Sequence, residues 1–295
     1  RHPSLINETF TSGMVVSTDS VFMEMIMNTK PLLVLLIAFC ISACAAPEAV
    51  HYRVPDQVKG DRVSAILAQL PPVSEQQQGE RINQISAAFL GTPYQADTLI
   101  GSPETPEALV INFNGVDCFT LLDYVQALSR SQDRASFEAN LVRTRYAGGE
   151  VSYLKRRHFF SDWFAESPRN ATDITRTLSP DAVTVVKQLN REVSGKERLP
   201  GLGVVPRRIT YIPARAITSQ VLKQIQTGDY IGVYTNAQGL DVSHVGIAVW
   251  HDGRLWFRNA SSLAINRKVV DTPFREYMRS KPGIIVLRAV PLTAS

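Results

Sequence analysis

The sequence predicts an α+β fold in which helices come first and an antiparallel sheet follows. Apolar residues recur at helical spacing in the first half, whereas apolar runs of β type lie at 230–234, 242–250 and 255–260. Asp252-Gly253, between the last two runs, is a strong signal for a two-residue hairpin turn. Helices followed by hairpin-connected strands are typical of α+β proteins.

Two helices are expected before residue 92. Residues 61–70 have helical spacing and stop before Pro71-Pro72. Ser74-Glu75-Gln76-Gln77 has the form of a capping box and opens a second helix, which Gly91 ends. The apolar stripe of this second helix includes Ile82, Ile85 and Phe89.

The rest of the chain is expected to alternate between loops and short elements. Residues 91–113 are rich in Gly, Pro, Thr and Asn and predict a long loop. Between 167 and 206 the pattern is weak, and 183–189 fits a strand or a helix. Further helices are expected at about 118–130, 134–142, 218–226 and 271–280, and a last strand at 283–290.

The beginning of the chain has the features of a bacterial lipoprotein signal. A short basic start at Met27-Asn28-Thr29-Lys30 precedes an apolar run from Pro31 to Ala43, too short to cross a bilayer. Ile41-Ser42-Ala43-Cys44 resembles a lipobox, in which cleavage leaves an acylated cysteine at the new amino terminus. Two or three acyl chains hold a protein on a membrane. We therefore expect lipidation at Cys44, with an ordinary secretory signal as the alternative.

This interpretation divides the chain into four parts. Residues 1–26 are expected to be untranslated or unstructured, and 27–43 to form the signal peptide. Residues 44–59 would carry the lipidated cysteine and a tether, and 60–295 a single domain. Ala45 stands where an aspartate often marks retention in the inner membrane, so we expect the outer membrane, facing the periplasm.

The cysteines and the net charge limit the classes of function that fit this sequence. Cys40 lies in the signal and Cys44 carries lipid, which leaves Cys118 as the one free thiol expected in the mature protein. An unpaired cysteine in an exported protein points to reactivity. The sequence after residue 43 has 29 basic and 24 acidic residues, an excess that suits work beside anionic envelope polymers. No basic cluster with aromatics indicates nucleic acid, and no ligand spacing indicates a metal.

Cys118 is the candidate nucleophile. Asp117 predicts an N-cap, which places the Cys118 thiol in the first turn of a helix. The positive end of the helix dipole favours a thiolate there, and backbone N–H groups of the same turn can point at a developing oxyanion. The alternative is a small, buried apolar side chain.

His244 is the candidate base. It alternates with Gly246 and Ala248 on one face of a predicted strand, while branched residues occupy the other face. We expect the branched face to pack into a core and the small-residue face to leave room for a helix end and a substrate. Neutral imidazole has a suitable pKa for accepting a thiol proton.

Asn259 is the candidate third member of the site. A two-residue turn at Asp252-Gly253 places Asn259 opposite Gly246, so that Asn259 and His244 are diagonal neighbours on one face. The carboxamide can then hold the second imidazole nitrogen. The alternative is a polar residue that satisfies the backbone near a strand end.

The combination of these stretches resembles the NlpC-type, papain-like cell-wall cysteine hydrolases, and more closely the bacterial N-acetylmuramoyl-L-alanine amidase-like family. The matches cover about residues 80–290 and comprise 89–94, 117–120, 145–149, Tyr153 with 157–163, 239–244 and 259–262. The resemblance implies a papain-like fold, with the nucleophile-bearing helix packed on an antiparallel sheet. It also implies a Cys–His pair with a polar third member, without metal or organic cofactor.

The resemblance also implies roles for further residues. Relatives commonly carry His where Asn259 stands, and a tyrosine at the position of Tyr94 lies beside the nucleophile. Tyr94 and Asp117 are therefore candidate oxyanion or substrate residues, and residues 157–163 are expected to shape the cleft.

The expected function is hydrolysis of the amide between N-acetylmuramic acid and L-alanine in peptidoglycan or muropeptides, through a thioester on Cys118. Three alternatives use the same cleft. The first is an endopeptidase that cuts after D-glutamate, the second is an envelope lipoprotein that binds glycan or peptide without catalysis, and the third is an acyltransferase.

Overall fold

The computed structural model describes residues 52–53, 61–72 and 78–292. The expected signal peptide, the lipidated cysteine and the capping box at 74–77 lie outside these residues. Within the expected tether, strand β1 (Tyr52–Arg53) pairs in parallel with β2 (Leu109–Val110). No helix in the described part of the chain is long and apolar enough to span a membrane.

The described elements form an α+β fold. The helices are α1 Arg62–Leu67, α2 Gln78–Ala87, α3 Cys118–Ser129, α4 Arg134–Arg145, α5 Asp162–Ala165, α6 Thr175–Leu178, α7 Ser219–Gln224 and α8 Phe274–Met278. Short 3-10 turns cover η2 Ala147–Gly149, η3 Tyr153–Lys155 and η4 Ala214–Ala216. The remaining strands are β3 Ala171–Asp173, β4 Val183–Leu189, β5 Val205–Pro213, β6 Tyr230–Tyr234, β7 Val242–His251, β8 Arg254–Ala260, β9 Val269–Pro273 and β10 Gly283–Ala289.

One antiparallel sheet organises the chain. Its order is β4-β5-β10-β6-β7-β8-β9, and β3 pairs with β10. The predicted fold class, helices first and an antiparallel sheet afterwards, is confirmed at this level. Strand β7, which carries His244, lies inside the sheet between β6 and β8.

Most of the predicted elements are present. Asp61 caps α1 by accepting a hydrogen bond from Ser64 N, and Gly91 has the expected left-handed backbone at φ 82°. Two expectations are wrong. Strand β5 had no predicted counterpart, and the helix expected at 271–280 is divided between β9 and α8. Pro273 marks this division, because proline cannot donate to a sheet ladder but is tolerated where a helix begins.

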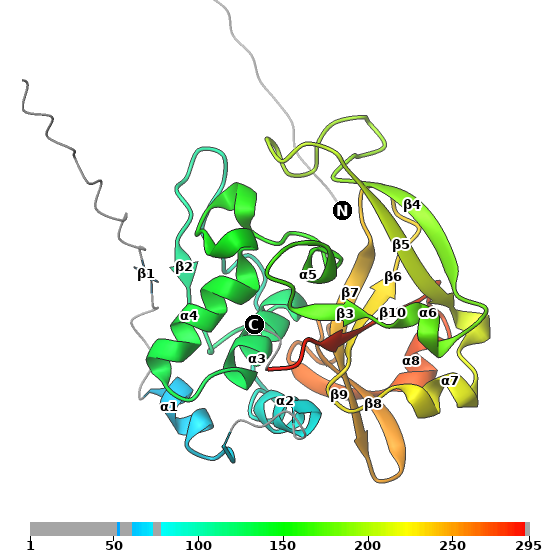
Figure 1. Ribbon diagram of the computed structural model, residues 1–295, viewed down its shortest axis with the longest axis horizontal. Coiled ribbons are helices and arrows are strands. Elements are labelled where there is room, and N and C mark those ends of the chain that lie inside the picture. The colour runs from blue at the N-terminus through cyan, green and yellow to red at the C-terminus, as the bar shows by residue number, and fades with distance from the viewer. Residues whose placement is uncertain (1–51, 54–60, 73–77, 293–295) are drawn as a thin grey trace, which may run out of the picture. The chain divides into compact units, whose positions relative to one another are not determined.

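Both faces of the sheet are covered (Figure 1), by α1 to α4 on one side and by α6, α7 and α8 on the other. Helix α3 packs on β7 and β8, and its buried Leu121 and Val125 share a core with Ile247. A second core on the opposite face includes Ala248 and Phe257.

The expected packing of β7 is therefore half right. Its branched face is buried as predicted, but α3 lies on that face and not on the face of His244. On the His244 face the small side chains accommodate an aromatic ring instead of a helix end. An added Cβ on Gly246 would lie 2.5 Å from the ring of Phe257, so glycine is needed for this close approach.

A buried ion pair joins α3 to α4. Arg145 Nε donates to Asp123 Oδ2 at 2.8 Å, both side chains are at most 2% exposed, and Arg145 Nη1 donates to the Val110 carbonyl oxygen at 2.8 Å. The guanidinium also lies 5.3 Å from the ring centroid of Tyr124. This pair gives residue 145, in one of the stretches that match the family, a structural role.

Replacing Asp123 by asparagine is expected to destabilise the fold by about 3–5 kcal/mol, because Arg145 would keep a buried charge without a counterion. Urea unfolding followed by circular dichroism measures the loss. The double variant Asp123→Leu/Arg145→Met is the control, and it should recover most of the stability because it removes both charges. A single variant within 1 kcal/mol of the wild type would contradict the assignment.

Candidate active site

Cys118 is the first residue of α3, and its position is fixed by a complete capping box. The Asp117 carboxylate accepts hydrogen bonds from Phe119 N at 2.9 Å and Thr120 N at 2.7 Å, and Thr120 Oγ1 accepts one from Asp117 N at 3.0 Å. Asp117 is thus the predicted N-cap. Its carboxylate only accepts hydrogen bonds, so we assign it to positioning Cys118 and not to stabilising an oxyanion.

The thiol of Cys118 faces the strand that carries His244. Cys118 is partly exposed, and the backbone N–H of Val245, which directly follows His244, lies close enough to the sulfur to lower the pKa of the thiol. The hydrogen bonds within the described part of the chain do not include one between the sulfur and the imidazole. The contact between the two elements runs through the β7 backbone.

The surroundings of Cys118 work against the ionised thiol that the sequence predicts at rest. Burial and the nearby Asp117 carboxylate raise the pKa of Cys118 to about 12, although the backbone N–H groups of Val245, Cys118 and Phe119 act in the opposite direction. Desolvation therefore outweighs the helix terminus. The resting thiol is protonated, so its use as a nucleophile requires a base.

His244 and Asn259 are hydrogen-bonded, with 3.0 Å between His244 Nε2 and Asn259 Oδ1. Asn259 Nδ2 lies 3.0 Å from the Phe257 carbonyl oxygen and 3.2 Å from Thr272 Oγ1. Because a carbonyl oxygen only accepts hydrogen bonds, Nδ2 must face Phe257, and Oδ1 must face the imidazole. His244 therefore donates from Nε2 and keeps the lone pair on Nδ1, which is the tautomer that a base needs.

The hairpin register that brings the two side chains together is the predicted one. Strands β7 and β8 pair from Ile247–Arg258 to His251–Arg254 around the two-residue turn, and Asp252 and Gly253 have φ 52° and 68°. Beyond Ile247–Arg258, β7 continues along β6 while β8 continues along β9. The imidazole and the carboxamide meet where the two strands part.

Replacing Asn259 by alanine is expected to lower kcat/KM about 10²-fold, because the imidazole loses the group that fixes its orientation and tautomer. Initial rates on a soluble muropeptide measure the effect. Asn259→His, the residue that the family resemblance suggests at this position, should retain more activity than Asn259→Ala. An alanine variant as active as the wild type would remove Asn259 from the site.

The environment of His244 keeps its ring neutral. Burial lowers the pKa of His244 below its ordinary 6.5, the Lys281 charge lowers it further, and Asn259 and Asp117 act in the opposite direction. A neutral imidazole beside a protonated thiol is the resting state that these shifts produce.

The acid limb of kcat/KM is expected to lie below pH 6.5, because the imidazole stays neutral until the pH falls through its lowered pKa. Lys281→Gln removes a cation, so it should raise the pKa of His244 and move the acid limb to higher pH. A pH–rate profile measures both, with Lys223→Gln, an exposed lysine on α7, as the control. An acid limb at the same pH in Lys281→Gln and the wild type would show that the Lys281 charge does not act on His244.

Two tyrosines flank the sulfur. Tyr94, predicted from the resemblance, forms a bridge with Val116 next to the N-cap, and its N donates to the Arg267 carbonyl oxygen at 2.9 Å. Tyr277 of α8 was missed by sequence reasoning, and its ring centroid lies 6.4 Å from that of His244. Burial raises the pKa of both phenols, and a negative charge on Cys118 would raise each further, which places both near the thiol.

The segment 157–163, expected to shape the cleft, contacts the helices next to the site. Arg157 Nη1 donates to the carbonyl oxygens of Thr144 at 2.9 Å and Tyr146 at 3.2 Å, at the end of α4. Trp163 is fully buried, 6.2 Å from the ring of Phe119, the residue after the candidate nucleophile. Trp163 therefore packs against the first turn of α3, and Arg157 ties the segment to the end of α4.

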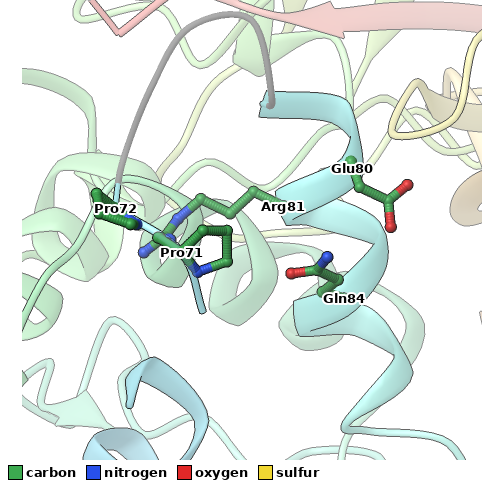
Figure 2. A pocket seen from close by; sticks show the side chains of 5 residues that line it. All are labelled: Pro71, Pro72, Glu80, Arg81 and Gln84. Carbon is green, nitrogen blue, oxygen red and sulfur yellow. The ribbon is translucent and has the colours of Figure 1, made fainter. Parts of the chain in front are cut away.

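A pocket elsewhere contains none of the predicted site residues. It is lined by Pro71, Pro72, Glu80, Arg81 and Gln84 (Figure 2). The guanidinium of Arg81 donates to the carbonyl oxygens of Ser129 and Ser131, at the carboxyl end of α3. Because α3 has 12 residues, this pocket lies about 16 Å along the helix from Cys118.

Comparisons with known proteins place the chain in a family. A family model described as N-acetylmuramoyl-L-alanine amidase-like matches residues 84–284. An N-acetylmuramoyl-L-alanine amidase structure from Bacteroides uniformis is 30% identical with a TM-score of 0.61, and the match covers 72% of this chain and 99% of that one. A Legionella pneumophila structure assigned to DUF1460 is 26% identical with a TM-score of 0.65, covering 78% of this chain and 94% of that one.

A search of curated proteins finds no match. The family model alone extends over more than half of the chain, and the sequence segments that resemble the family fall almost wholly within the matched range. The chain therefore belongs to the N-acetylmuramoyl-L-alanine amidase-like family.

Proposed function

We propose that this protein is a cysteine-dependent peptidoglycan hydrolase that cleaves the amide between the lactyl group of N-acetylmuramic acid and L-alanine. One observation carries the proposal. The Asn259 carboxamide fixes the His244 tautomer on a strand whose next residue, Val245, has its backbone N–H close enough to the Cys118 sulfur to act on the thiol. Membership in the amidase-like family supports the choice of amide bond.

The acylation step starts from the protonated thiol. His244 Nδ1 accepts the thiol proton while Cys118 Sγ forms a bond to the lactyl carbonyl carbon. The developing oxyanion takes hydrogen bonds from the backbone N–H of Cys118 and from the Tyr94 hydroxyl, which its raised pKa keeps protonated. The imidazolium then protonates the nitrogen of L-alanine, the C–N bond breaks, and a thioester remains.

Hydrolysis returns the enzyme to its resting state. Water attacks the thioester while His244 accepts one of its protons, the C–S bond breaks, and the sulfur recovers the proton. The products are the sugar with a free lactyl carboxylate and a peptide with a free L-alanine amine. We further propose that the fold belongs to the papain-like, NlpC-type superfamily, since a helix that begins with Cys118 packs on the strand of His244.

Mass spectrometry of digested muropeptides tests the bond that is cut. Released tripeptide or tetrapeptide beginning with L-alanine is the expected product. An L-alanyl-D-glutamate dipeptide left on the sugar would overturn the amidase in favour of an endopeptidase. If the wild type, like Cys118→Ala, releases no new product, the protein would be a binding protein and not an enzyme. Thiol labelling does not separate these cases, because burial raises the pKa of Cys118 in either one.

The lipid anchor at Cys44 and a periplasmic location at the outer membrane are proposals from the sequence. Both rest on residues outside the described part of the chain. Metabolic labelling with a palmitate analogue tests them, with Cys44→Ser as the control that should lose the label. Label retained by Cys44→Ser would contradict the anchor.

A further inference from the structure

A lysine lies at the edge of the candidate site on the face of a tyrosine. Lys281 Nζ is 4.6 Å from the ring centroid of Tyr277, and its backbone N donates to the Met278 carbonyl oxygen at the end of α8. The Tyr277 ring is itself 5.2 Å from that of Phe257, which packs on Gly246 of β7. The lysine is thus held beside the strand that carries His244.

A second cation has the same arrangement on the other side of the sulfur. The guanidinium of Arg267 lies 5.0 Å from the ring centroid of Tyr94. Tyr94 packs against the core that contains α3, whereas Tyr277 packs against the core on the opposite face of the sheet. The two cation–tyrosine pairs therefore approach Cys118 from different sides.

Neither cation has a carboxylate partner among residues 52–53, 61–72 and 78–292. Some other half-buried basic residues pair with carboxylates, such as Arg156 with Glu107, and others donate to carbonyl oxygens, such as Lys187 to those of Thr235 and Ala237. Lys281 is half-buried and close to the proposed catalytic groups. An unpaired, partly desolvated ammonium at this position is available for an anionic group of a substrate.

The chemistry of the reaction decides which part of the substrate Lys281 meets. His244 must return its proton to the leaving nitrogen, so the leaving peptide lies on the imidazole side of the sulfur. Tyr277 lies on that side, next to the imidazole. In a muropeptide cut at L-alanine, the leaving peptide continues with a D-glutamate joined through its side chain, which leaves its α-carboxylate free.

We propose that Tyr277 and Lys281 form a carboxylate-binding subsite on the leaving-group side, which recognises the free α-carboxylate of the D-glutamate that follows L-alanine. The proposal rests on the proposed amidase function. Tyr277 supplies an apolar floor for the peptide, and Lys281 supplies the charge. The subsite would make the enzyme distinguish peptides with a free carboxylate from peptides in which this group is amidated.

Two matched substrates test the subsite, N-acetylmuramoyl-L-alanyl-γ-D-glutamyl-L-lysine and the same molecule with the α-carboxylate of D-glutamate converted to an amide. The wild type should prefer the free acid about tenfold in kcat/KM, mainly through KM. Lys281→Gln should cleave the acid and the amide at about equal kcat/KM, and Lys281→Arg should keep most of the preference for the acid. Rates are measured above the acid limb of every variant, so that the pKa of His244 does not enter.

Arg267→Gln is the matched control, because it removes a cation that also lies on a tyrosine, but on one that packs against the other core of the sheet. It should change the rates on both substrates alike and leave their ratio as in the wild type. An unchanged ratio in Lys281→Gln, with both rates lowered equally, would overturn the subsite while the amidase function stands.

Calorimetry keeps the test independent of turnover. The product peptide L-alanyl-γ-D-glutamyl-L-lysine should bind the wild type about tenfold more tightly than the same peptide with the D-glutamate α-carboxylate amidated, and Lys281→Gln should bind the two alike. If neither sugar-linked substrate is cleaved, the proposed function fails, and this comparison still decides the subsite. Equal binding of acid and amide by the wild type would overturn it.

Discussion

Replacing Cys118 by alanine is expected to reduce the turnover of purified peptidoglycan by about 10⁴-fold or more. Cys118 is the one free thiol in the described part of the chain, and it faces the strand of His244. Without the sulfur no thioester forms, so only the electrostatic and binding contributions of the site remain. Release of soluble muropeptides, followed by chromatography, measures the loss.

The variant also has a clear control for folding. Alanine is a strong helix former, and the capping bonds of Asp117 use backbone groups of Phe119 and Thr120, so α3 should still begin at the same residue. The thermal midpoint of Cys118→Ala should stay within a few degrees of the wild type. Turnover within tenfold of the wild type, at unchanged stability, would remove Cys118 from the mechanism. Another residue of this protein would then have to be the nucleophile.

Sequence reasoning succeeded where short-range chemistry decides the structure. The Asp117 cap depends on residues three positions away, and the register of β7 with β8 depends on the Asp252-Gly253 turn. Both were predictable because capping boxes and two-residue turns have specific residue preferences. The meeting of His244 with Asn259 then followed from strand alternation alone.

Longer-range packing was not predictable in the same way. Alternation along β7 shows that its two faces differ, but not which of them receives α3, because that choice depends on what lies across the sheet. Phe257 fills the space that the small residues of the His244 face leave open. Tyr277 was missed for a related reason, since it reaches the site from α8, which follows β9 within a segment expected to be one helix, and Lys281 lies just beyond that segment.

The thiol illustrates how two correct physical effects can compete. A helix amino terminus does favour a thiolate, and backbone N–H groups do act on Cys118 in that direction. Desolvation and the carboxylate of Asp117 act the other way and are stronger. The sequence contains the cap but not the degree of burial, so the sign of the shift could only come from the structure.

The raised pKa of Cys118 leads to the second large effect, which is expected when His244 is replaced. Because burial holds the pKa of Cys118 well above neutral pH, only a small fraction of the thiol is ionised at pH 7. Removal of the base by His244→Ala should therefore lower turnover at pH 7 by about 10⁴-fold or more, because acylation must wait for the rare thiolate. The loss should also shrink as the pH rises, by about tenfold per pH unit as far as the thiol pKa.

A pH series on His244→Ala separates this mechanism from a preformed ion pair. If the sulfur needs a base, log(kcat/KM) of the variant should rise with a slope of about one between pH 7 and 10, while the wild type stays flat above its acid limb. The Cys118→Ala variant, measured over the same range, gives the background from hydroxide. A flat profile for His244→Ala would show that the thiolate already exists near neutral pH. The helix terminus would then outweigh burial, and His244 would serve mainly to protonate the leaving nitrogen.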